Sequence, residues 1–152
     1  MTQAELDHQF MQQAIEQAQL AALAGEVPVG AVLVRDGKVV SKGFNQPITR
    51  HDPSAHAEML ALRLAAKAEE NYRLPGSTLY VTLEPCTMCA GAMLHARVDR
   101  IVYGASDPKT GAAGSVLDVF SLKQINHQTT VEGGIMGEEC GELLRSFFKG
   151  RR

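Results

Sequence analysis

The chain has 152 residues, of which 45% are hydrophobic and 21% are charged, and its formal net charge is −2. These values are typical of one globular domain, which at this size buries about 70% of its unfolded surface without disulfides. The small negative charge excludes a protein that coats nucleic acid by bulk positive charge, but permits a local basic patch. No apolar run reaches the ~20 residues of a membrane span, and residues 1–13 lack a signal-peptide apolar region. We therefore expect one domain over residues 1–152, located in the cytoplasm and without a membrane partner.

Periodicity and turn residues predict an alternating series of helices and strands. The first helix opens with a Thr-x-x-Glu capping box, and the first two strands flank Asp36-Gly37, which is typical of a tight hairpin turn. Two prolines predict a loop over residues 46–54. In chain order, we expect a helix at 4–24, strands at 30–35 and 38–44, a helix at 55–70, a strand at 77–83, a helix at 86–97, strands at 100–103 and 128–131, and a helix at 138–149.

This order of elements predicts the fold class. A strand, a helix and a second strand follow one another over residues 77–103, which favours a parallel βαβ unit. The Asp36-Gly37 hairpin adds an antiparallel pair, so the sheet is expected to be mixed. We therefore predict an α/β protein with three α/β/α layers around a mixed, roughly five-stranded sheet.

Two short motifs point to a metal centre, namely His56-Ala57-Glu58 and Pro85-Cys86-Thr87-Met88-Cys89. They offer two thiolates and one imidazole, and three such ligands leave the fourth tetrahedral position of a catalytic zinc open for water. Each motif opens a predicted helix, whose positive N-terminal end favours the thiolates. His56 and Glu58 lie about 200° apart around an ideal helix, so their side chains would not both face one metal placed on the side of that helix. We therefore expect His56, Cys86 and Cys89 to bind one zinc, with Glu58 beside it as an acid/base.

Other interpretations of these motifs remain open. A lone Cys-x-x-Cys is often a redox pair or half of a structural zinc site, but the chain has no second such pair, and these interpretations leave His56 and Glu58 unused. A non-catalytic zinc or RNA-binding module is a third alternative. Such a structural site has no need of a free carboxylate, so Glu58 argues against it.

The two motifs together resemble the signature of the cytidine-deaminase-like zinc deaminases. The resemblance extends over nearly the whole chain and is specific to the family of bacterial tRNA-specific adenosine deaminases. The stretches that carry it are residues 26–32, Asn45, residues 51–58, 71–74, 82–93 and 107–115.

The resemblance implies a cytidine deaminase-like fold and hydrolysis of adenosine to inosine at the wobble position of a tRNA anticodon. It implies that water activated by zinc attacks C6 of the adenine while Glu58 shuttles protons, with one Zn²⁺ per subunit held by His56, Cys86 and Cys89. It further implies a homodimer that binds the anticodon stem-loop across both subunits. The closest rival is a deaminase of a free base or nucleoside, such as guanine or cytosine, on the same fold.

The resemblance also implies which residues contact the substrate. Asn45 would contact the target base, and the backbone at Ala57 and Pro85 would line its pocket. The loop holding Asp107 and Lys109, together with the terminal helix, would touch flanking nucleotides. The end of the chain mixes cations and aromatics, which hold phosphates and stack on bases. A purely structural helix is the alternative there, but we expect RNA contacts from Phe148, Arg151 and Arg152.

Overall fold

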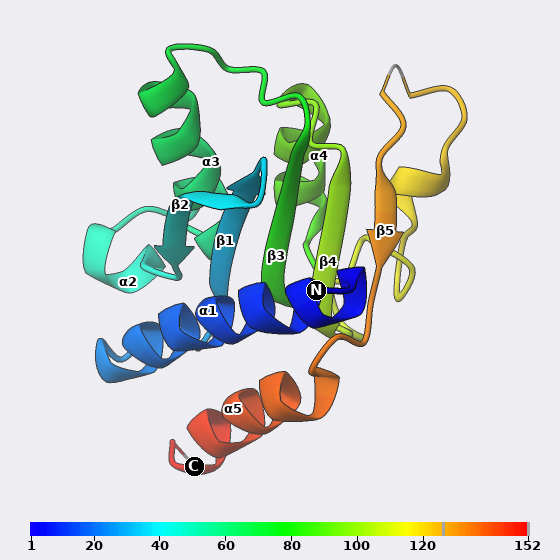
Figure 1. Cartoon of the computed structure of the whole chain (residues 1–152). Helices are drawn as coiled ribbons and strands as arrows, with labels where there is room; N and C mark the ends of the chain where they lie inside the picture. The colour runs from blue at the N-terminus through cyan, green and yellow to red at the C-terminus, as the bar shows by residue number, and fades with distance from the viewer. Residues whose placement is uncertain (126, 152) are drawn as a thin grey trace.

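A computed structural model of the protein describes residues 1–125 and 127–151. Helices cover both faces of one sheet (Figure 1). Every predicted helix and strand is present, with ends within two residues of those expected. The elements in chain order are α1 (Gln3–Leu23), β1 (Gly30–Arg35), β2 (Lys38–Phe44), α2 (Pro47–Arg50), α3 (Ala57–Glu69), β3 (Ser77–Leu83), α4 (Thr87–His95), β4 (Arg100–Ala105), the short 3-10 helix η1 (Val119–Ser121), β5 (Thr130–Glu132) and α5 (Gly137–Lys149).

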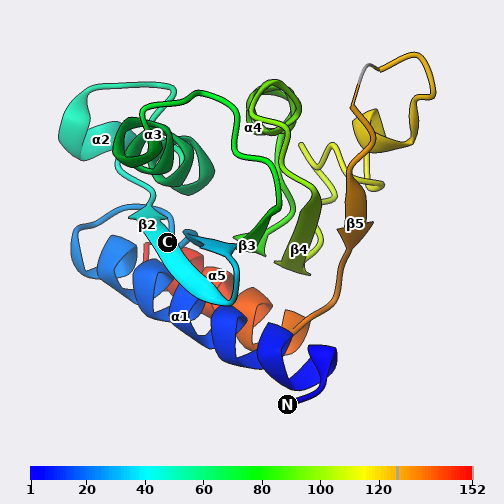
Figure 2. The same ribbon diagram turned by 45° about the horizontal axis from the view of Figure 1, so that its top comes forward.

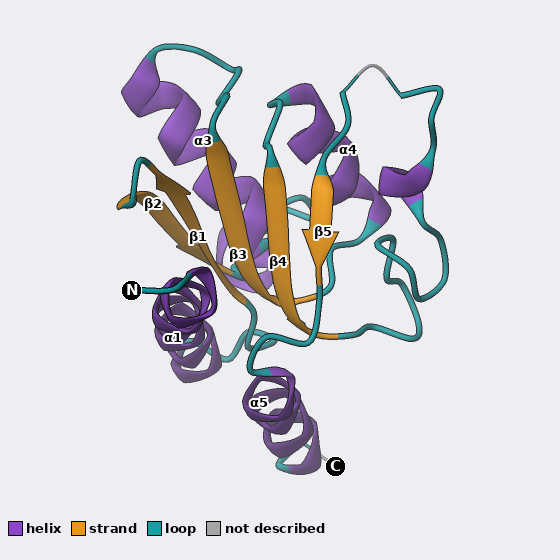
Figure 3. Ribbon diagram, turned by 45° about the vertical axis from the view of Figure 1, so that its right-hand side comes forward, coloured by secondary structure: helices purple, strands orange, loops and turns teal. Residues whose placement is uncertain are grey.

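The sheet is mixed and five-stranded, as predicted. Its strands lie in the order β2-β1-β3-β4-β5, with β1 antiparallel to both of its neighbours and β3, β4 and β5 parallel (Figure 3). Asp36 and Gly37 connect β1 to β2 with φ angles of +52° and +74°. Two positive φ angles in a row are the signature of a type I′ turn, whose twist matches that of the paired strands.

The side chains of the strands alternate between two hydrophobic layers. On β1, Val32 packs with Phe10 and Met11 of α1, whereas its neighbour Leu33 packs with Ala61 of α3 on the other face. This alternation follows from the two-residue period of a strand. Helices α1 and α5 consequently cover one face, and α3 and α4 cover the other (Figure 2). The three-layer α/β/α prediction is confirmed.

Helix α2 lies within residues 46–54, where a loop was predicted. Pro47 begins it, which suits a first helical position because proline has no N–H to leave unpaired. The buried carboxylate of Glu26 accepts hydrogen bonds from the N–H groups of Ile48 and Thr49, at 3.2 and 2.7 Å. Glu26, whose carboxylate accepts the free N–H groups at the start of this helix, lies 22 residues before Ile48. The local sequence therefore did not indicate the helix.

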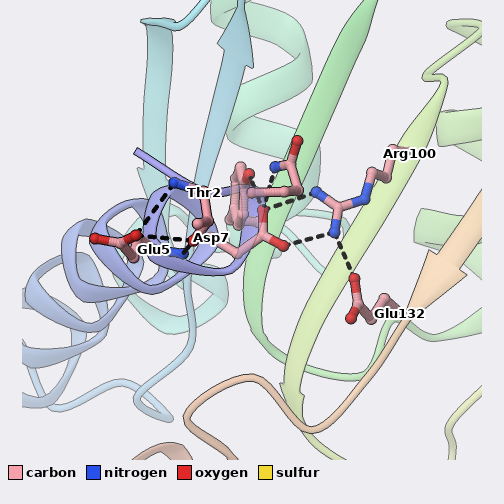
Figure 4. Close-up of polar contacts among 7 residues, drawn as sticks. Thr2, Glu5, Asp7, Arg100 and Glu132 are labelled. Atoms are coloured by element: carbon pink, nitrogen blue, oxygen red, sulfur yellow. Dashed lines mark hydrogen bonds and ion pairs between the residues drawn. The ribbon is translucent and has the colours of Figure 1, made fainter.

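A buried polar cluster ties α1 to the sheet (Figure 4). Asp7 is only 2% exposed. It accepts two hydrogen bonds from the guanidinium of Arg100, at 2.8 and 2.6 Å, and one from the hydroxyl of Tyr80, at 2.6 Å. Arg100 also pairs with Glu132 of β5. Burial acts to raise the pKa of Asp7, but the hydrogen bonds from Arg100 and Tyr80 outweigh it and lower the pKa.

We expect Asp7→Asn to lower the free energy of unfolding by about 3 kcal/mol at neutral pH, because it leaves a half-buried cation with a single carboxylate partner. Since the pKa of Asp7 is lowered in the folded state, the wild-type advantage is full above the ordinary value of 3.8 and is lost as the pH falls below it. Urea unfolding of both proteins at pH 7 and pH 3 measures this. An equal stability difference at both pH values would contradict the explanation.

No helix in the described part of the chain combines the length and apolarity needed to cross a bilayer.

Candidate active site

The predicted metal ligands lie at the N-terminal ends of two neighbouring helices. His56 is the N-cap residue of α3, and Cys86 is the N-cap residue of α4. Neither side chain makes the usual capping hydrogen bond, so both remain available to a ligand. The helix expected over residues 55–70 begins at Ala57 instead, so His56 precedes its first turn. Cys89 lies in the first turn of α4 and is fully buried.

Close packing of β2 against α3 places His56. A Cβ atom at Gly43 would lie 2.5 Å from the carbonyl oxygen of Ala57, so only glycine allows the strand to approach the helix this closely. The hydroxyl of Ser41 donates a hydrogen bond to the carbonyl of Ala61 at 2.7 Å. These contacts fix the start of α3 beside the end of β2.

The three side chains fit a zinc ion. Nδ1 of His56 lies 3.6 Å from Sγ of Cys86 and 3.5 Å from Sγ of Cys89, and the three ligand atoms all lie within 4.8 Å of one another. A tetrahedral zinc with Zn–S of ~2.3 Å and Zn–N of ~2.05 Å separates its nitrogen and sulfur ligands by about 3.5 Å. The geometry is therefore that of a three-ligand zinc site.

The two thiols differ in acidity. The pKa of Cys86 is lowered to about 4, mainly by its hydrogen bond with Cys89 and also by that with His56, against the effect of burial. The pKa of Cys89 is raised, because it is the donor in that hydrogen bond and because it is buried. Zinc binds cysteines as thiolates, so metal binding is accompanied by loss of the thiol protons of the pair.

Glu58 lies beside the ligands in the first turn of α3. It is 3% exposed, and burial raises its pKa to about 7. A carboxyl group with a pKa near neutrality accepts and returns a proton with little free-energy cost in either direction. The position suits an acid/base group next to the metal.

Two of the predicted base-binding residues, Asn45 and Ala57, are joined by a hydrogen bond. The side-chain oxygen of Asn45 accepts the N–H of Ala57 at 2.9 Å, which leaves its NH₂ group as a donor. The N–H of Asn45 itself donates to the carbonyl of Val29 at 3.1 Å. The carbonyl of Pro85 accepts the N–H of Ala112 at 2.8 Å. Asn45 and Ala57 are thus in contact, and Ala57 and Pro85 each adjoin a zinc ligand in the sequence. The N–H of Ala57 and the carbonyl of Pro85 already have partners within the chain.

The predicted RNA-contacting residues form a second group. Asp107, Lys109 and Phe148 line one surface hollow of about 360 Å³, and Lys109, Phe148 and Arg151 line a larger one of about 910 Å³. Phe148 is 47% exposed, and the guanidinium of Arg151 lies 4.2 Å from the ring centre of Phe147. The carboxylate of Asp107 instead accepts N–H groups of its own loop. Arg152 lies outside the described residues.

Sequence reasoning did not single out two buried carboxylates, Glu26 and Glu84, which are 1% and 2% exposed. Glu26 holds α2, next to Asn45, and Glu84 holds the loop that carries Asp107 and Lys109. The one signal in the sequence was that each of these acidic residues stands directly beside an apolar stretch. An acidic side chain that is buried with such a stretch needs strong partners.

Comparisons with known proteins agree with this geometry. The family described as "Cytidine and deoxycytidylate deaminase zinc-binding region" matches residues 4–105. The tRNA-specific adenosine deaminase of Haemophilus influenzae is 53% identical over 149 residues, covering 97% of this chain and 86% of that protein. The tRNA-specific adenosine deaminase of Bacillus subtilis is 47% identical, covering 98% of this chain and 91% of that protein.

Solved structures extend the comparison. One, from a study of A-to-I editing by tRNA:A34 deaminases at the wobble position of transfer RNA, has a TM-score of 0.87 and 46% identity, covering 90% of this chain and 99% of that one. Guanine deaminase from Nitrosomonas europaea has a TM-score of 0.78 but 24% identity, covering 92% of this chain and 83% of that one, and shares the fold alone. Since the family is defined by its zinc-binding region, the zinc prediction is confirmed. The chain belongs to the cytidine and deoxycytidylate deaminase zinc-binding family and, within it, to the tRNA-specific adenosine deaminases.

Proposed function

We propose that this protein hydrolyses adenosine to inosine, with release of ammonia, at the wobble position of a tRNA anticodon. The observation that carries the proposal is the coincidence of a three-ligand zinc site with a buried carboxyl group, in a chain closely related over nearly its full length to tRNA-specific adenosine deaminases. His56, Cys86 and Cys89 would hold the zinc, and when bound the ion supplies a water polarised for attack on carbon.

Glu58 carries the protons of the reaction in this proposal. Its carboxylate takes a proton from the attacking water and passes it to N1 of the adenine ring. It then takes the proton of the new C6 hydroxyl and passes it to the amino group, which leaves as ammonia when the C6–N bond breaks and C6=O forms, so that adenosine and water become inosine and ammonia. Burial of Glu58 raises its pKa above the ordinary value, which favours a group that can both accept and donate a proton. Asn45 would orient the base through its NH₂ group, against the backbone of Ala57 and Pro85.

The hollows lined by Lys109 and Phe148 suit flanking nucleotides. Lys109 offers a cation, the exposed ring of Phe148 offers a stacking face, and Arg151 extends the cationic edge. Contacts of this kind bind single-stranded RNA with little preference for sequence. Binding of flanking nucleotides would then position the target base at the zinc, which favours an anticodon loop over a free nucleoside.

We expect truncation after Gly150, which removes Arg151 and Arg152, to weaken stem-loop binding without loss of zinc. If the removed arginines bind phosphates, the plot of log binding constant against log salt flattens by about 0.7 for each single-strand phosphate that is no longer neutralised. Fluorescence anisotropy at several salt concentrations, with the full chain as the control, measures this. An unchanged slope would make the tail structural.

A guanine deaminase is the second candidate, because such an enzyme shares this fold. The two functions differ in substrate size, since a small-molecule enzyme has no use for the cationic hollow at Lys109 and Arg151. Rates measured on an anticodon stem-loop, free adenosine and free guanine separate them. We expect the stem-loop to react fastest, and faster turnover of guanine would reverse the assignment.

We also propose a homodimer in the cytoplasm. Exposed apolar side chains occur on α3, in the segment that follows it and on α4, where Leu64, Tyr72 and Met88 are 55%, 64% and 36% exposed. Burial of such side chains between two copies would stabilise a pair. A reducing compartment would keep both zinc-binding thiols free of disulfides. Sedimentation over a range of concentrations should give twice the chain mass, and a constant single-chain mass would exclude the dimer.

A further inference from the structure

Glu84 is a buried acidic residue at the C-terminal end of the central strand of the sheet, two residues before the zinc ligand Cys86. It directly follows β3, and its N–H donates to the carbonyl of Ala105, the last residue of β4, at 2.9 Å. It therefore lies where two parallel strands end, which is where loops of α/β proteins commonly build a binding site. Only Pro85 separates it from the zinc ligand Cys86.

The carboxylate of Glu84 holds both ends of the loop at residues 107–115. Oε1 accepts the N–H of Asp107 at 3.0 Å, and Oε2 accepts the N–H groups of Ala113 and Ser115 at 2.9 and 3.1 Å. The hydroxyl of Ser115 donates to Oε1 as well. An ionised carboxylate is a pure acceptor, so it satisfies all of these donors, and charged hydrogen bonds are about twice as strong as neutral ones.

The loop fits closely around this carboxylate. A Cβ atom at Gly111 would lie 2.4 Å from both Cδ and Oε2 of Glu84, so a side chain at that position would displace it. The next residue, Ala112, donates its N–H to the carbonyl of Pro85 at 2.8 Å. Two consecutive residues immediately before Cys86 therefore fasten the 107–115 loop, one by its side chain and the other by its backbone.

We propose that Glu84 is a positioning residue that sets the 107–115 loop, and with it Lys109, at a fixed place relative to the zinc ligands. This inference rests on the proposed function, in which the loop binds nucleotides that flank the target base. The loop has hydrogen bonds of its own, such as those that the Asp107 carboxylate accepts from Lys109 and Thr110, but these do not fix its place relative to the strands, which needs constraints from outside the loop. The Glu84 carboxylate supplies these constraints, and it belongs to the segment that also supplies the zinc ligand Cys86. The loop that binds substrate and the metal site are therefore held by the same segment of the chain.

The test replaces Glu84 by Gln, which keeps the size but turns an NH₂ donor toward the N–H groups of the loop. We expect the zinc content to stay at one per chain, amide exchange at residues 107–115 to rise about tenfold, and KM for an anticodon stem-loop to rise about tenfold, since the loss of a charged hydrogen bond corresponds to a factor of at least that size. We expect kcat at saturating stem-loop to change much less than KM.

The Asp7→Asn variant is the matched control, because it also neutralises a buried carboxylate but lies in the α1 layer on the opposite face of the sheet from α3 and α4. It should lower the melting temperature without changing loop exchange or KM. Should Glu84→Gln not fold, Ser115→Ala removes only the hydroxyl donor, and a smaller change in the same direction is then expected.

Unchanged loop exchange and unchanged KM in the Glu84 variant would overturn the proposal. Loss of zinc with a parallel fall in kcat would also overturn it, because Glu84 would then hold Cys86 instead of the loop. If the wild-type protein does not deaminate the stem-loop at all, the proposed function fails, while the exchange measurement still decides whether Glu84 fastens the loop.

Discussion

Replacement of Glu58 by Gln should lower the turnover of a wobble-adenosine stem-loop by about 10²–10⁴-fold, the usual scale of general acid–base catalysis. The amide keeps the size of the side chain and cannot take up a proton. Glu58 is buried in the first turn of α3, next to but not among the three atoms that fit the metal. The zinc should therefore remain bound, which elemental analysis of the variant measures alongside the rate.

Glu69→Gln is the matched control for this experiment. It makes the same substitution at the end of the same helix, where Glu69 forms a partly exposed ion pair with Arg35. Such pairs contribute little to stability, so both turnover and zinc content should match the wild type. Loss of zinc from the Glu58 variant would instead make Glu58 a metal ligand, and turnover close to that of the wild type would remove it from the mechanism.

Replacement of Cys86 by Ala should bring the zinc content close to zero and lower turnover by more than about 10³-fold, because the several kcal/mol that a polarised water supplies are lost. Two ligands remain at the N-terminal ends of α3 and α4, and they do not satisfy a zinc ion. The melting temperature should also fall, since a metal that binds only the folded state stabilises it. Elemental analysis and thermal unfolding measure these effects.

Cys140→Ala is the control for the thiol itself. Cys140 is a buried free cysteine that packs with α1 side chains in the layer opposite α3 and α4. Its replacement removes core packing but no metal ligand, so zinc content and turnover should stay near wild-type values. A Cys86 variant that keeps a full complement of zinc would contradict the three-ligand site.

Local signals in the sequence predicted the elements whose stabilising contacts are local. Thr2 and Glu5 form the expected capping box at the start of α1, with the Thr2 hydroxyl accepting the N–H of Glu5 at 3.1 Å (Figure 4). The Asp36-Gly37 turn adopts the expected positive φ angles. In both cases the residues that determine the conformation lie within a few positions of each other. The pattern of residue types at that spacing was therefore sufficient to predict the local structure.

Contacts between distant segments could not be predicted in this way. Helix α2 depends on Glu26, and the 107–115 loop depends on Glu84, which lies 23 residues before Asp107. An acidic side chain in a sequence does not indicate which backbone groups it will meet. The zinc ligands are an exception, although His56 and Cys86 lie 30 residues apart. The chemistry of the ion restricts its ligands to few residue types and spacings, so a short motif was informative.

The end of the chain allowed two interpretations, and the structure bears on both. Phenylalanines packed on the core would have indicated a structural helix. Phe148 is instead 47% exposed and lines the hollow that also contains Lys109. The exposed ring is available for stacking on a base, which supports the interpretation in favour of RNA contact.

The most direct test of the central claim is to incubate the zinc-loaded protein with an anticodon stem-loop that carries adenosine at the wobble position and at other positions. Nuclease digestion and mass spectrometry then locate any inosine, and an ammonia assay gives its stoichiometry. We predict inosine at the wobble position alone, one ammonia for each inosine, and a greatly reduced yield with Glu58→Gln. A stem-loop that stays unmodified while the same protein consumes free guanine would contradict the assignment.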